Sequence, residues 1–287
     1  MIATQPVNLN EPGFYPGVPE AVYRALPFEN QSGLKGGPTP LHLKHARETP
    51  REPTASMALG TALHIAVLEP ETFRSRVVVK PTFAGEGAHT RRREWEAEHA
   101  GAVVVTAAQM DDCRGMYQSV MAHDGARSLV ERAGWNECVA VWDDEWFPDV
   151  RCKARADRIV QVDGRALILD LKSTDDASER GFAGSCAAYG YHQQDAWYSE
   201  GFGKVLRRDA VTVFIAVESH APYAVAMYEL NDEARAVGHS ENVRALEWIG
   251  RGKTTGAWPG YGDAVSMLAL PAWKLREVNV CIEREAP

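Results

Sequence analysis

Two apolar runs on either side of Asp163-Gly164 restrict the folding of this chain more than any other feature. Residues 154–162 and 166–171 are rich in aliphatic side chains, and only a short polar segment separates them. Asp-Gly is the dipeptide that a tight two-residue hairpin turn prefers, because both of its residues tolerate positive φ angles. The two runs are therefore predicted to be the strands of one antiparallel pair.

Charged side chains interrupt these apolar strands. Asp157 lies in the first strand, Asp170 lies near the end of the second, and Lys172 follows two residues later. Side chains alternate between the two faces of a strand, so Asp170 and Lys172 must point to the same face. With the hairpin between them, Asp157 and Asp170 can reach the same end of the sheet.

Hydrophobic periodicity predicts an α-rich N-terminal half and a second half in which strands and helices are mixed. A short helix is predicted over residues 19–26, and longer ones over 41–47, 57–68, 90–99, 107–121, 126–133, 177–202 and 232–249; further strands are predicted over 138–142, 150–162, 210–217 and 224–230. The fold class expected is α/β or α+β, with a central mixed β-sheet flanked by helices. We expect a single domain over residues 1–287, with an irregular N-terminal arm (1–31) and an irregular C-terminal extension (250–287).

Composition excludes several classes of protein. The five cysteines are scattered and form no C-x-x-C pair, which argues against a zinc module, an iron–sulfur cluster or a disulfide scaffold. No stretch approaches the roughly 18 apolar residues of a membrane span, and the N-terminus lacks a secretion signal. We therefore expect a cytoplasmic protein with no membrane partner. The net charge of −8 provides no overall attraction to nucleic acid, although a basic groove can coexist with an acidic exterior.

The carboxylates and the lysine of the central strands are the groups needed for metal-assisted hydrolysis of a phosphodiester. Carboxylates are the oxygen ligands that Mg²⁺ prefers, and Mn²⁺ could replace it. Lys172 would orient or deprotonate the attacking water, or stabilise charge on the phosphoryl oxygens. However, a D-x-K tripeptide is common by chance, and a charged pair at a strand end is more often a solvated edge.

Two predicted helices carry further candidate groups. His64 lies on the apolar helix 57–68, where a lone histidine is more often a core residue than a ligand, although neutral imidazole can bind a metal. Gly60, one turn earlier, would permit a close approach to a sheet. Gln194 and Tyr198 share one face of a later helix, and the alternative there is an ordinary amphipathic surface.

The order of these motifs resembles that of the PD-(D/E)xK nuclease superfamily, which implies a restriction-endonuclease-like core. Within it, the chain most resembles the exonuclease VIII (RecE-type) branch of phage and prophage recombination exonucleases. The motifs that carry the resemblance are Gly60-x-x-x-His64, Leu68-Glu69-Pro70, Cys152-Lys153-Ala154-Arg155-Ala156-Asp157, Asp170-Leu171-Lys172 and Gln194-x-x-x-Tyr198.

The resemblance implies a role for each central residue. His64, Asp157 and Asp170 would bind Mg²⁺ together with the backbone carbonyl of Leu171. Asp157, Asp170 and Lys172 would be the catalytic residues.

The resemblance also implies residues that contact DNA. Gln194 and Tyr198 would lie beside the site and contact the DNA strand. Ser32 and Lys35 match an early S-x-L-K turn, where a helix capped by Ser32 could bind a 5′ phosphate at its N-terminus. Glu137, expected just before the first core strand, would support the metal ligands or lie at the rim.

The resemblance implies a Mg²⁺-dependent exonuclease that digests double-stranded DNA ends from 5′ to 3′. Its 3′ single-stranded tails would pass to a single-strand annealing recombinase (RecT-type) in phage-type recombination, and the protein would form a homo-oligomeric ring. Two alternatives remain open: a structure-specific or site-specific endonuclease of the same fold, and a catalytically silent DNA-binding or assembly protein.

Overall fold

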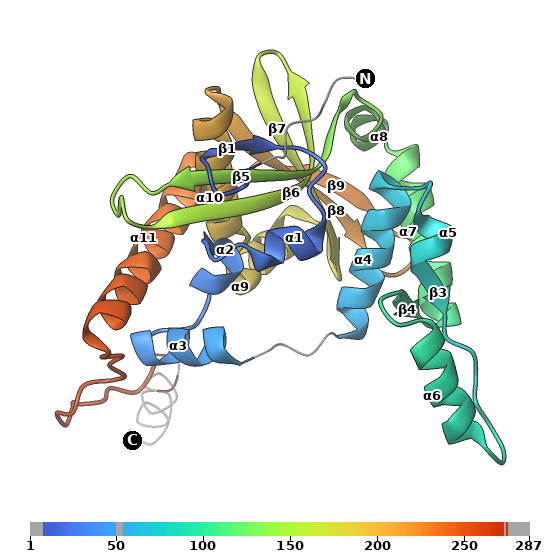
Figure 1. Ribbon diagram of the computed structural model, residues 1–287, viewed down its shortest axis with the longest axis horizontal. Helices are drawn as coiled ribbons and strands as arrows, with labels where there is room; N and C mark the ends of the chain where they lie inside the picture. Colours follow the sequence, from blue (N-terminus) through green and yellow to red (C-terminus); the bar gives the residue numbers. More distant parts are fainter. Residues whose placement is uncertain (1–7, 50–53, 273, 275–287) are drawn as a thin grey trace, which may run out of the picture.

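A seven-stranded sheet forms the centre of the protein (Figure 1). The computed structural model describes residues 8–49, 54–272 and 274. The sheet order is β1-β5-β6-β7-β8-β9, and the short β2 pairs with β6. Within this sheet, all of whose strands lie in the described residues, the β7–β8 and β2–β6 pairs are parallel and the other pairs are antiparallel. The strands are β1 (Gly13–Tyr15), β2 (Glu29–Asn30), β5 (Gly134–Asp143), β6 (Arg151–Val162), β7 (Arg165–Thr174), β8 (Ala210–Glu218) and β9 (Val225–Tyr228).

The predicted hairpin is confirmed. β6 and β7 pair from Val162↔Arg165 inward, and the turn residues Asp163 and Gly164 have φ angles of 48° and 83°. Two consecutive positive φ angles match the right-handed twist of the strands, which is why Asp-Gly suits this position.

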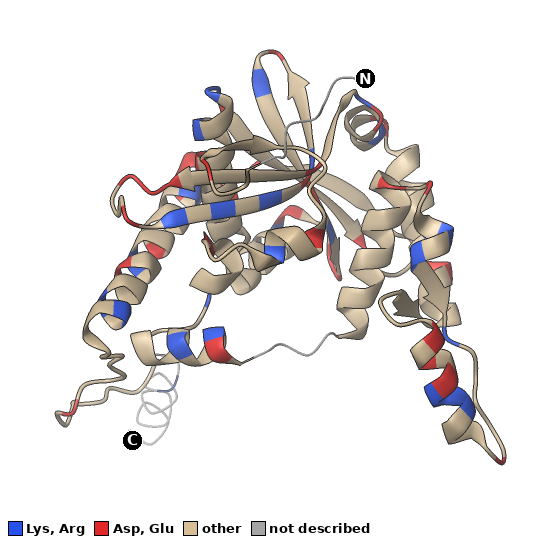
Figure 2. Cartoon of the chain, in the orientation of Figure 1, with Lys and Arg blue, Asp and Glu red and all other residues tan. Residues whose placement is uncertain are grey.

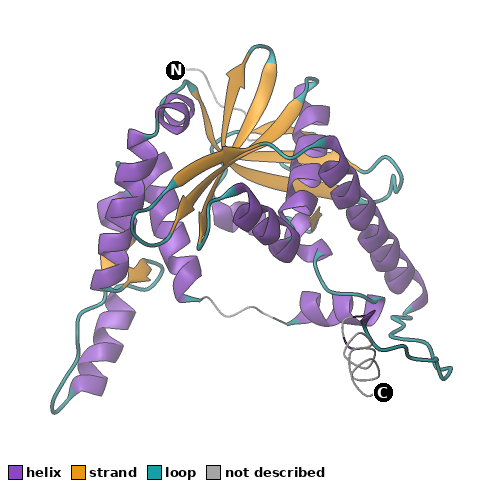
Figure 3. Ribbon diagram, turned by 180° about the vertical axis from the view of Figure 1, so that it is seen from behind, coloured by secondary structure: helices purple, strands orange, loops and turns teal. Residues whose placement is uncertain are grey.

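Helices cover both faces of the sheet (Figures 1 and 3). One core joins the sheet to α10 and α11 through side chains such as Trp142, Trp197 and Leu246. A second core joins it to α4 and α7 through Leu63, Met116 and Ile215. The mixed fold expected from the sequence is therefore confirmed. The helices on these faces are α4 (Ala55–Leu68), α7 (Ala107–Ala122), α8 (Asp124–Val130), α9 (Glu179–Tyr189), α10 (Tyr191–Leu206) and α11 (Asp232–Thr255).

The remaining elements lie at the periphery. A small parallel sheet, β3–β4, adjoins α6, which projects away from the central sheet in Figure 1. These elements are α1 (Glu20–Ala25), α2 (Gln31–Leu34), α3 (Pro40–Glu48), α5 (Phe73–Arg76), β3 (Val77–Val79), α6 (Ala88–Glu98) and β4 (Val103–Val105).

Three sequence predictions need correction. The arm expected to be irregular contains β1, which extends the sheet beside β5, whereas α1 agrees with the short helix predicted over residues 19–26. The helix predicted over 177–202 is two helices, because Gly190 adopts a left-handed conformation with φ of 65°. The C-terminal extension begins later than expected, because α11 continues to Thr255 and ends at Gly256. Residues 1–7 and 275–287 of the arm and the extension lie outside the described residues.

Glu29 joins β2 to the helices α3 and α11. Its buried carboxylate lies 2.8 Å from Nη1 of Arg47 on α3 and 2.7 Å from Nζ of Lys253 on α11. Burial alone would raise the pKa of Glu29, but the hydrogen bonds and charges of Arg47 and Lys253 outweigh this effect and lower it. The ionised carboxylate therefore holds α3 and α11 against β2.

Glu29→Gln is expected to reduce the free energy of unfolding by about 2 kcal/mol at pH 7, because both cations lose their charged partner. The folded-state pKa of Glu29 lies below its unfolded value, so its contribution is full above the usual glutamate pKa and is lost as pH falls through the folded value. Urea unfolding at pH 7 and at acid pH measures both effects. Glu20→Gln, in an exposed pair with Arg24, is the control and should change stability by less than about 1 kcal/mol. A Glu29→Gln difference that does not shrink in acid would contradict this account.

Candidate active site

The two aspartates lie where strands β6 and β7 separate. The β6–β7 ladder ends at Arg158↔Leu169, immediately before Asp157 and Asp170. Beyond that point β7 continues to pair with β8. Within β6, all of whose residues the structure describes, Asp157 is the one residue without a ladder partner on either side. The separation leaves both carboxylates beside a space in which a ligand can lie.

Glu137 lies on the neighbouring strand β5, directly opposite Asp157 of β6. It is within β5 and not before it, as the sequence had suggested, and its φ angle is 53°. This left-handed conformation accompanies the gap in the β5–β6 ladder at Asp157. Its carboxylate forms an ion pair with Arg155, so Glu137 contacts the site through that arginine.

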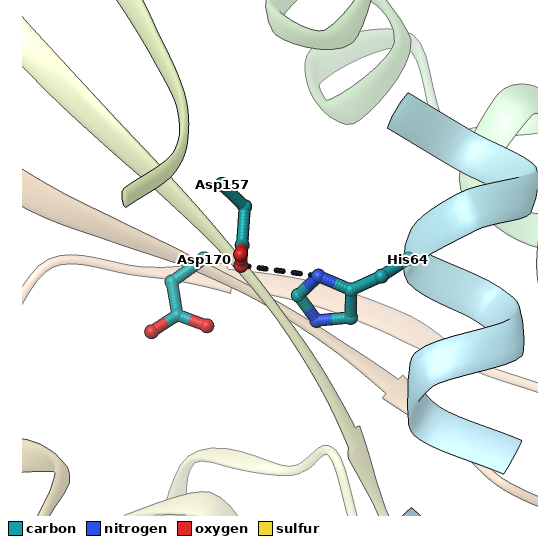
Figure 4. A group of neighbouring side chains, drawn as sticks. All are labelled: His64, Asp157 and Asp170. Carbon is teal, nitrogen blue, oxygen red and sulfur yellow. Dashed lines mark ion pairs between the residues drawn. The ribbon is translucent and has the colours of Figure 1, made fainter. Parts of the chain in front are cut away.

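His64 reaches the aspartates from α4 (Figure 4). Its Nδ1 lies 3.0 Å from Oδ2 of Asp157, and its Nε2 lies 2.6 Å from the backbone oxygen of Leu171. One ligand atom from each of His64, Asp157 and Asp170 falls within 4.8 Å of the others. The sequence suggested that Gly60 permits a close approach of α4 to the sheet. This explanation is wrong, because a Cβ there would meet only Ser173 Oγ, at an ordinary contact distance of 3.5 Å.

Asp170, Lys172 and Gln194 form a closed hydrogen-bonded group. Nζ of Lys172 lies 2.9 Å from Oδ1 of Asp170 and donates to Oε1 of Gln194 at 3.2 Å. The Gln194 amide nitrogen donates to Oδ2 of Asp170. The carboxylate of Asp170 is only 4% exposed, and such a charge is tolerated because both of its oxygens have donors.

Electrostatics fix the protonation states of this group. Burial alone would lower the pKa of His64, but the charge and hydrogen bond of Asp157 outweigh this effect and raise it. Burial alone would raise the pKa of Asp157, but the charge and hydrogen bond of His64 lower it. Burial likewise opposes the protonated form of Lys172, but Asp170 raises its pKa. Lys172 therefore carries a proton at neutral pH.

The residues present fit a small divalent cation. Carboxylate oxygens from Asp157 and Asp170, the backbone oxygen of Leu171 and an imidazole nitrogen of His64 converge on one place. Mg²⁺ and Mn²⁺ prefer oxygen donors, and imidazole is a common additional ligand for Mn²⁺. Both nitrogens of His64 face acceptors in this structure, so a cation bound by the ring would replace one of its protons.

A cavity of about 390 Å³ opens onto these groups. Its walls include Asp157, Asp170 and Lys172, as expected, but also Tyr23 and Arg24 of α1. Sequence reasoning missed this contribution because α1 has only six residues and none of them is buried. The N-terminal segment is therefore a wall of the site.

Lys153 fixes α1 against the sheet. The residue is only 3% exposed, and Nζ donates to the backbone oxygens of Tyr23 and Leu26 at 2.9 and 2.5 Å. Nζ also lies 4.7 Å from the centre of the Tyr23 ring. A lysine within the apolar run of β6 was the sequence signal that could have revealed this anchor.

The predicted DNA-contacting residues divide into two groups. Gln194, Tyr198 and Ser32 line the cavity, and the Tyr198 hydroxyl donates to the backbone oxygen of Arg155. Lys35 is not among the lining residues, and its Nζ donates to the backbone oxygen of Tyr189 at 2.6 Å.

The helix expected after Ser32 differs from the prediction. Asn30, not Ser32, is the N-cap of α2, and its side chain accepts from the backbone N–H of Gly33. The helix has only four residues, so its dipole provides little support for an anion site.

Residues 39–270 match the family described as PDDEXK-like domain of unknown function (DUF3799). The chain belongs to this family. The match includes every residue of the His64–Asp157–Asp170 cluster, and no protein among the curated sequences matches the chain.

The fold of this PDDEXK-like chain is similar to that of a crystal structure described as a "putative exonuclease" from Eubacterium rectale. The alignment covers 86% of this chain and 92% of that one, at 12% identity and a TM-score of 0.56. At this identity the likeness concerns the fold, and it agrees with a restriction-endonuclease-like core. The structure of SSO0001 aligns over 64% of this chain and 84% of that one, at 16% identity and a TM-score of 0.28, which is too low to support an argument.

Family and fold suggest that this PDDEXK-like chain is a nuclease. PDDEXK nucleases generally use divalent metal ions, and the chain has an acidic cluster suited to one. Among the described residues, no helix combines the length and apolar character required to span a bilayer.

Proposed function

We propose that this PDDEXK-like chain is a Mg²⁺-dependent exodeoxyribonuclease that digests duplex DNA from an end, with 5′-to-3′ polarity, and leaves 3′ single-stranded tails. One observation carries the proposal: ligand atoms of His64, Asp157 and Asp170 lie within 4.8 Å of one another, and Lys172 contacts Asp170. The resemblance of the motifs to the RecE-type branch supports digestion from an end, and so does the fold shared with a protein described as a "putative exonuclease".

The metal site and the lysine have separate tasks in this proposal. His64, Asp157, Asp170 and the Leu171 carbonyl would hold the cation, which supplies a Lewis acid for the phosphate and a water of lowered pKa. Because Asp170 raises the pKa of Lys172, the lysine acts as a cation beside the phosphoryl oxygens and stabilises their developing charge.

Residues of α10 position the reacting groups. Gln194 accepts from Lys172 and donates to Asp170, so its amide fixes the angle between the lysine and the carboxylate. The Tyr198 hydroxyl is held by the backbone of Arg155, so its ring keeps its place in the cavity wall.

The charge distribution is compatible with DNA as the substrate. Figure 2 shows basic residues spaced along β6, the strand that carries Asp157, although the net charge of the chain is −8. Buried or paired side chains on β6 contribute little to this attraction, but Arg24 and Arg155 line the cavity, and a locally basic groove attracts the phosphate backbone even when the whole molecule is acidic. The proposal has three further parts. The chain acts in the cytoplasm as one nuclease domain, and it assembles into a ring of identical subunits. The ring passes the 3′ single-stranded DNA tails to a RecT-type annealing protein.

Linear and covalently closed duplexes distinguish the proposed exonuclease from its alternatives. With Mg²⁺, the protein is expected to release nucleotides from linear DNA and to leave the closed circle intact, because an exonuclease needs an end. Label placed on one strand at each end then determines polarity. Cleavage of the closed circle would favour the endonuclease, and no hydrolysis of either substrate would favour a silent DNA-binding protein.

A further inference from the structure

The junction of α9 and α10 holds an exposed aromatic ring close to Lys172. Tyr189 ends α9, and its residue is 64% exposed. Its ring centre lies 5.8 Å from that of Tyr191, and the Tyr191 ring centre lies 4.6 Å from Nζ of Lys172. One ring therefore separates Tyr189 from the amine of the active site.

The backbone that carries Tyr189 is firmly held. Its carbonyl accepts from Nζ of Lys35 at 2.6 Å. The next residue, Gly190, has a φ of 65°, and a Cβ there would lie 2.6 Å from Oε1 of Gln193 and 3.0 Å from Cε of Lys35. Any other residue would be strained in conformation and crowded by its neighbours. The sharp change of direction between α9 and α10 therefore requires glycine at position 190, and it fixes the backbone of Tyr189.

Tyr191 provides a rigid support for the exposed ring. It stacks on Phe214 of β8 with ring centres 5.8 Å apart and contacts Phe182 of α9 at 5.9 Å. Phe182 and Phe214 are fully buried. Tyr189 therefore continues a row of rings that begins in the core and ends in solvent.

We propose that Tyr189 stacks on an unpaired base of the DNA strand being digested, on the nucleotide next to the phosphate that Lys172 contacts. The inference rests on the proposed function and adds a base-binding position to it. Neither Tyr189 nor Tyr191 lines the cavity. The stacked base is therefore that of a nucleotide adjacent to the one whose phosphate occupies the cavity. Stacking is tolerant of sequence because every base has a π-face, which suits an enzyme that digests any end.

Binding measurements with and without the base test this position. The probe is a duplex with a splayed end, carrying either normal nucleotides or abasic nucleotides at the first positions of the digested strand, with EDTA to prevent hydrolysis. Tyr189→Ala is expected to weaken binding of the normal probe about 5- to 10-fold, the lower end of measured base–aromatic stacking. The same substitution should leave binding of the abasic probe unchanged.

Two variants serve as controls. Tyr189→Phe keeps the ring and should bind both probes like the wild type. Trp146→Ala removes an equally exposed ring, 68% accessible, from the loop between β5 and β6, and should also have no effect. A 2-aminopurine placed at the same position should be quenched by the wild type and by Tyr189→Phe but not by Tyr189→Ala.

The outcomes separate this inference from the proposed function. Equal weakening of both probes by Tyr189→Ala, or no weakening, overturns the stacking role. If the stacking role fails but the wild-type protein digests linear DNA with Mg²⁺, the proposed nuclease function still stands. If the wild type hydrolyses no DNA, the proposed nuclease function fails, whatever the binding data show.

Discussion

Replacing Lys172 by alanine is expected to lower the rate of DNA hydrolysis about 10²- to 10⁴-fold, with little change in DNA affinity. The estimate is the usual effect of removing a group that stabilises charge or transfers a proton in the transition state. Lys172 is 18% exposed and contacts Asp170, Gln194 and the Tyr191 ring, so its ammonium group is held beside the carboxylates. Single-turnover hydrolysis of end-labelled linear DNA measures the effect on the chemical step.

Controls for Lys172 must exclude a loss of folding. The alanine variant leaves the buried carboxylate of Asp170 with fewer donors, which lowers stability. Lys172→Gln keeps an N–H donor for Asp170 but removes the charge, so it should fold and remain inactive. Lys204→Ala, which removes a half-buried lysine paired with Glu200 on the surface of α10, should retain full activity. An active Lys172→Gln enzyme would contradict the role assigned to the charge.

Asp170→Asn is expected to abolish both hydrolysis and the response of the protein to divalent cations. Cation that binds only the folded state raises its stability, by about 2.7 kcal/mol at a concentration 100 times the dissociation constant. For a chain of this size, that corresponds to a rise in Tm of about 4–5 °C. The wild type should show this rise with Mn²⁺ or Mg²⁺, and Asp170→Asn should not, because the neutral amide is a poor ligand.

A matched substitution tests whether the effect belongs to the site. Asp163→Asn changes an aspartate in the β6–β7 turn, where φ is 48° and asparagine is tolerated. It should keep both the hydrolysis and the cation-induced rise in Tm. Addition of EDTA should return wild-type protein to the Tm of the cation-free state. A wild-type Tm that is indifferent to divalent cations would exclude the metal site.

Local sequence predicted the features that depend on neighbouring residues. The β6–β7 hairpin follows from the turn preference of Asp163-Gly164, and the shared face of Asp170 and Lys172 follows from strand periodicity. Gln194 and Tyr198 share a helix face for the same kind of reason. These patterns hold within a few residues of the chain, so they require no knowledge of packing.

Other features could not be derived from periodicity. His64 meets the Leu171 carbonyl across 107 positions of sequence, and only the packing of α4 against the sheet makes that contact. On its own helix, His64 could equally be a core residue, and the family resemblance was needed to assign it. Local sequence indicates the short helix α1 but not its position as a wall of the site, because Lys153 secures that helix from a distant strand.

The sequence by itself determined the central hairpin, the mixed fold class and the order of the motifs, because turn chemistry and side-chain alternation are local properties. Only the tertiary structure decided that the β6–β7 ladder ends at Arg158↔Leu169, so that Asp157 and Asp170 face the space His64 enters. It also decided that Tyr189 stands exposed one ring away from Lys172. Such arrangements depend on long-range packing, which places distant segments side by side without leaving a pattern in either one.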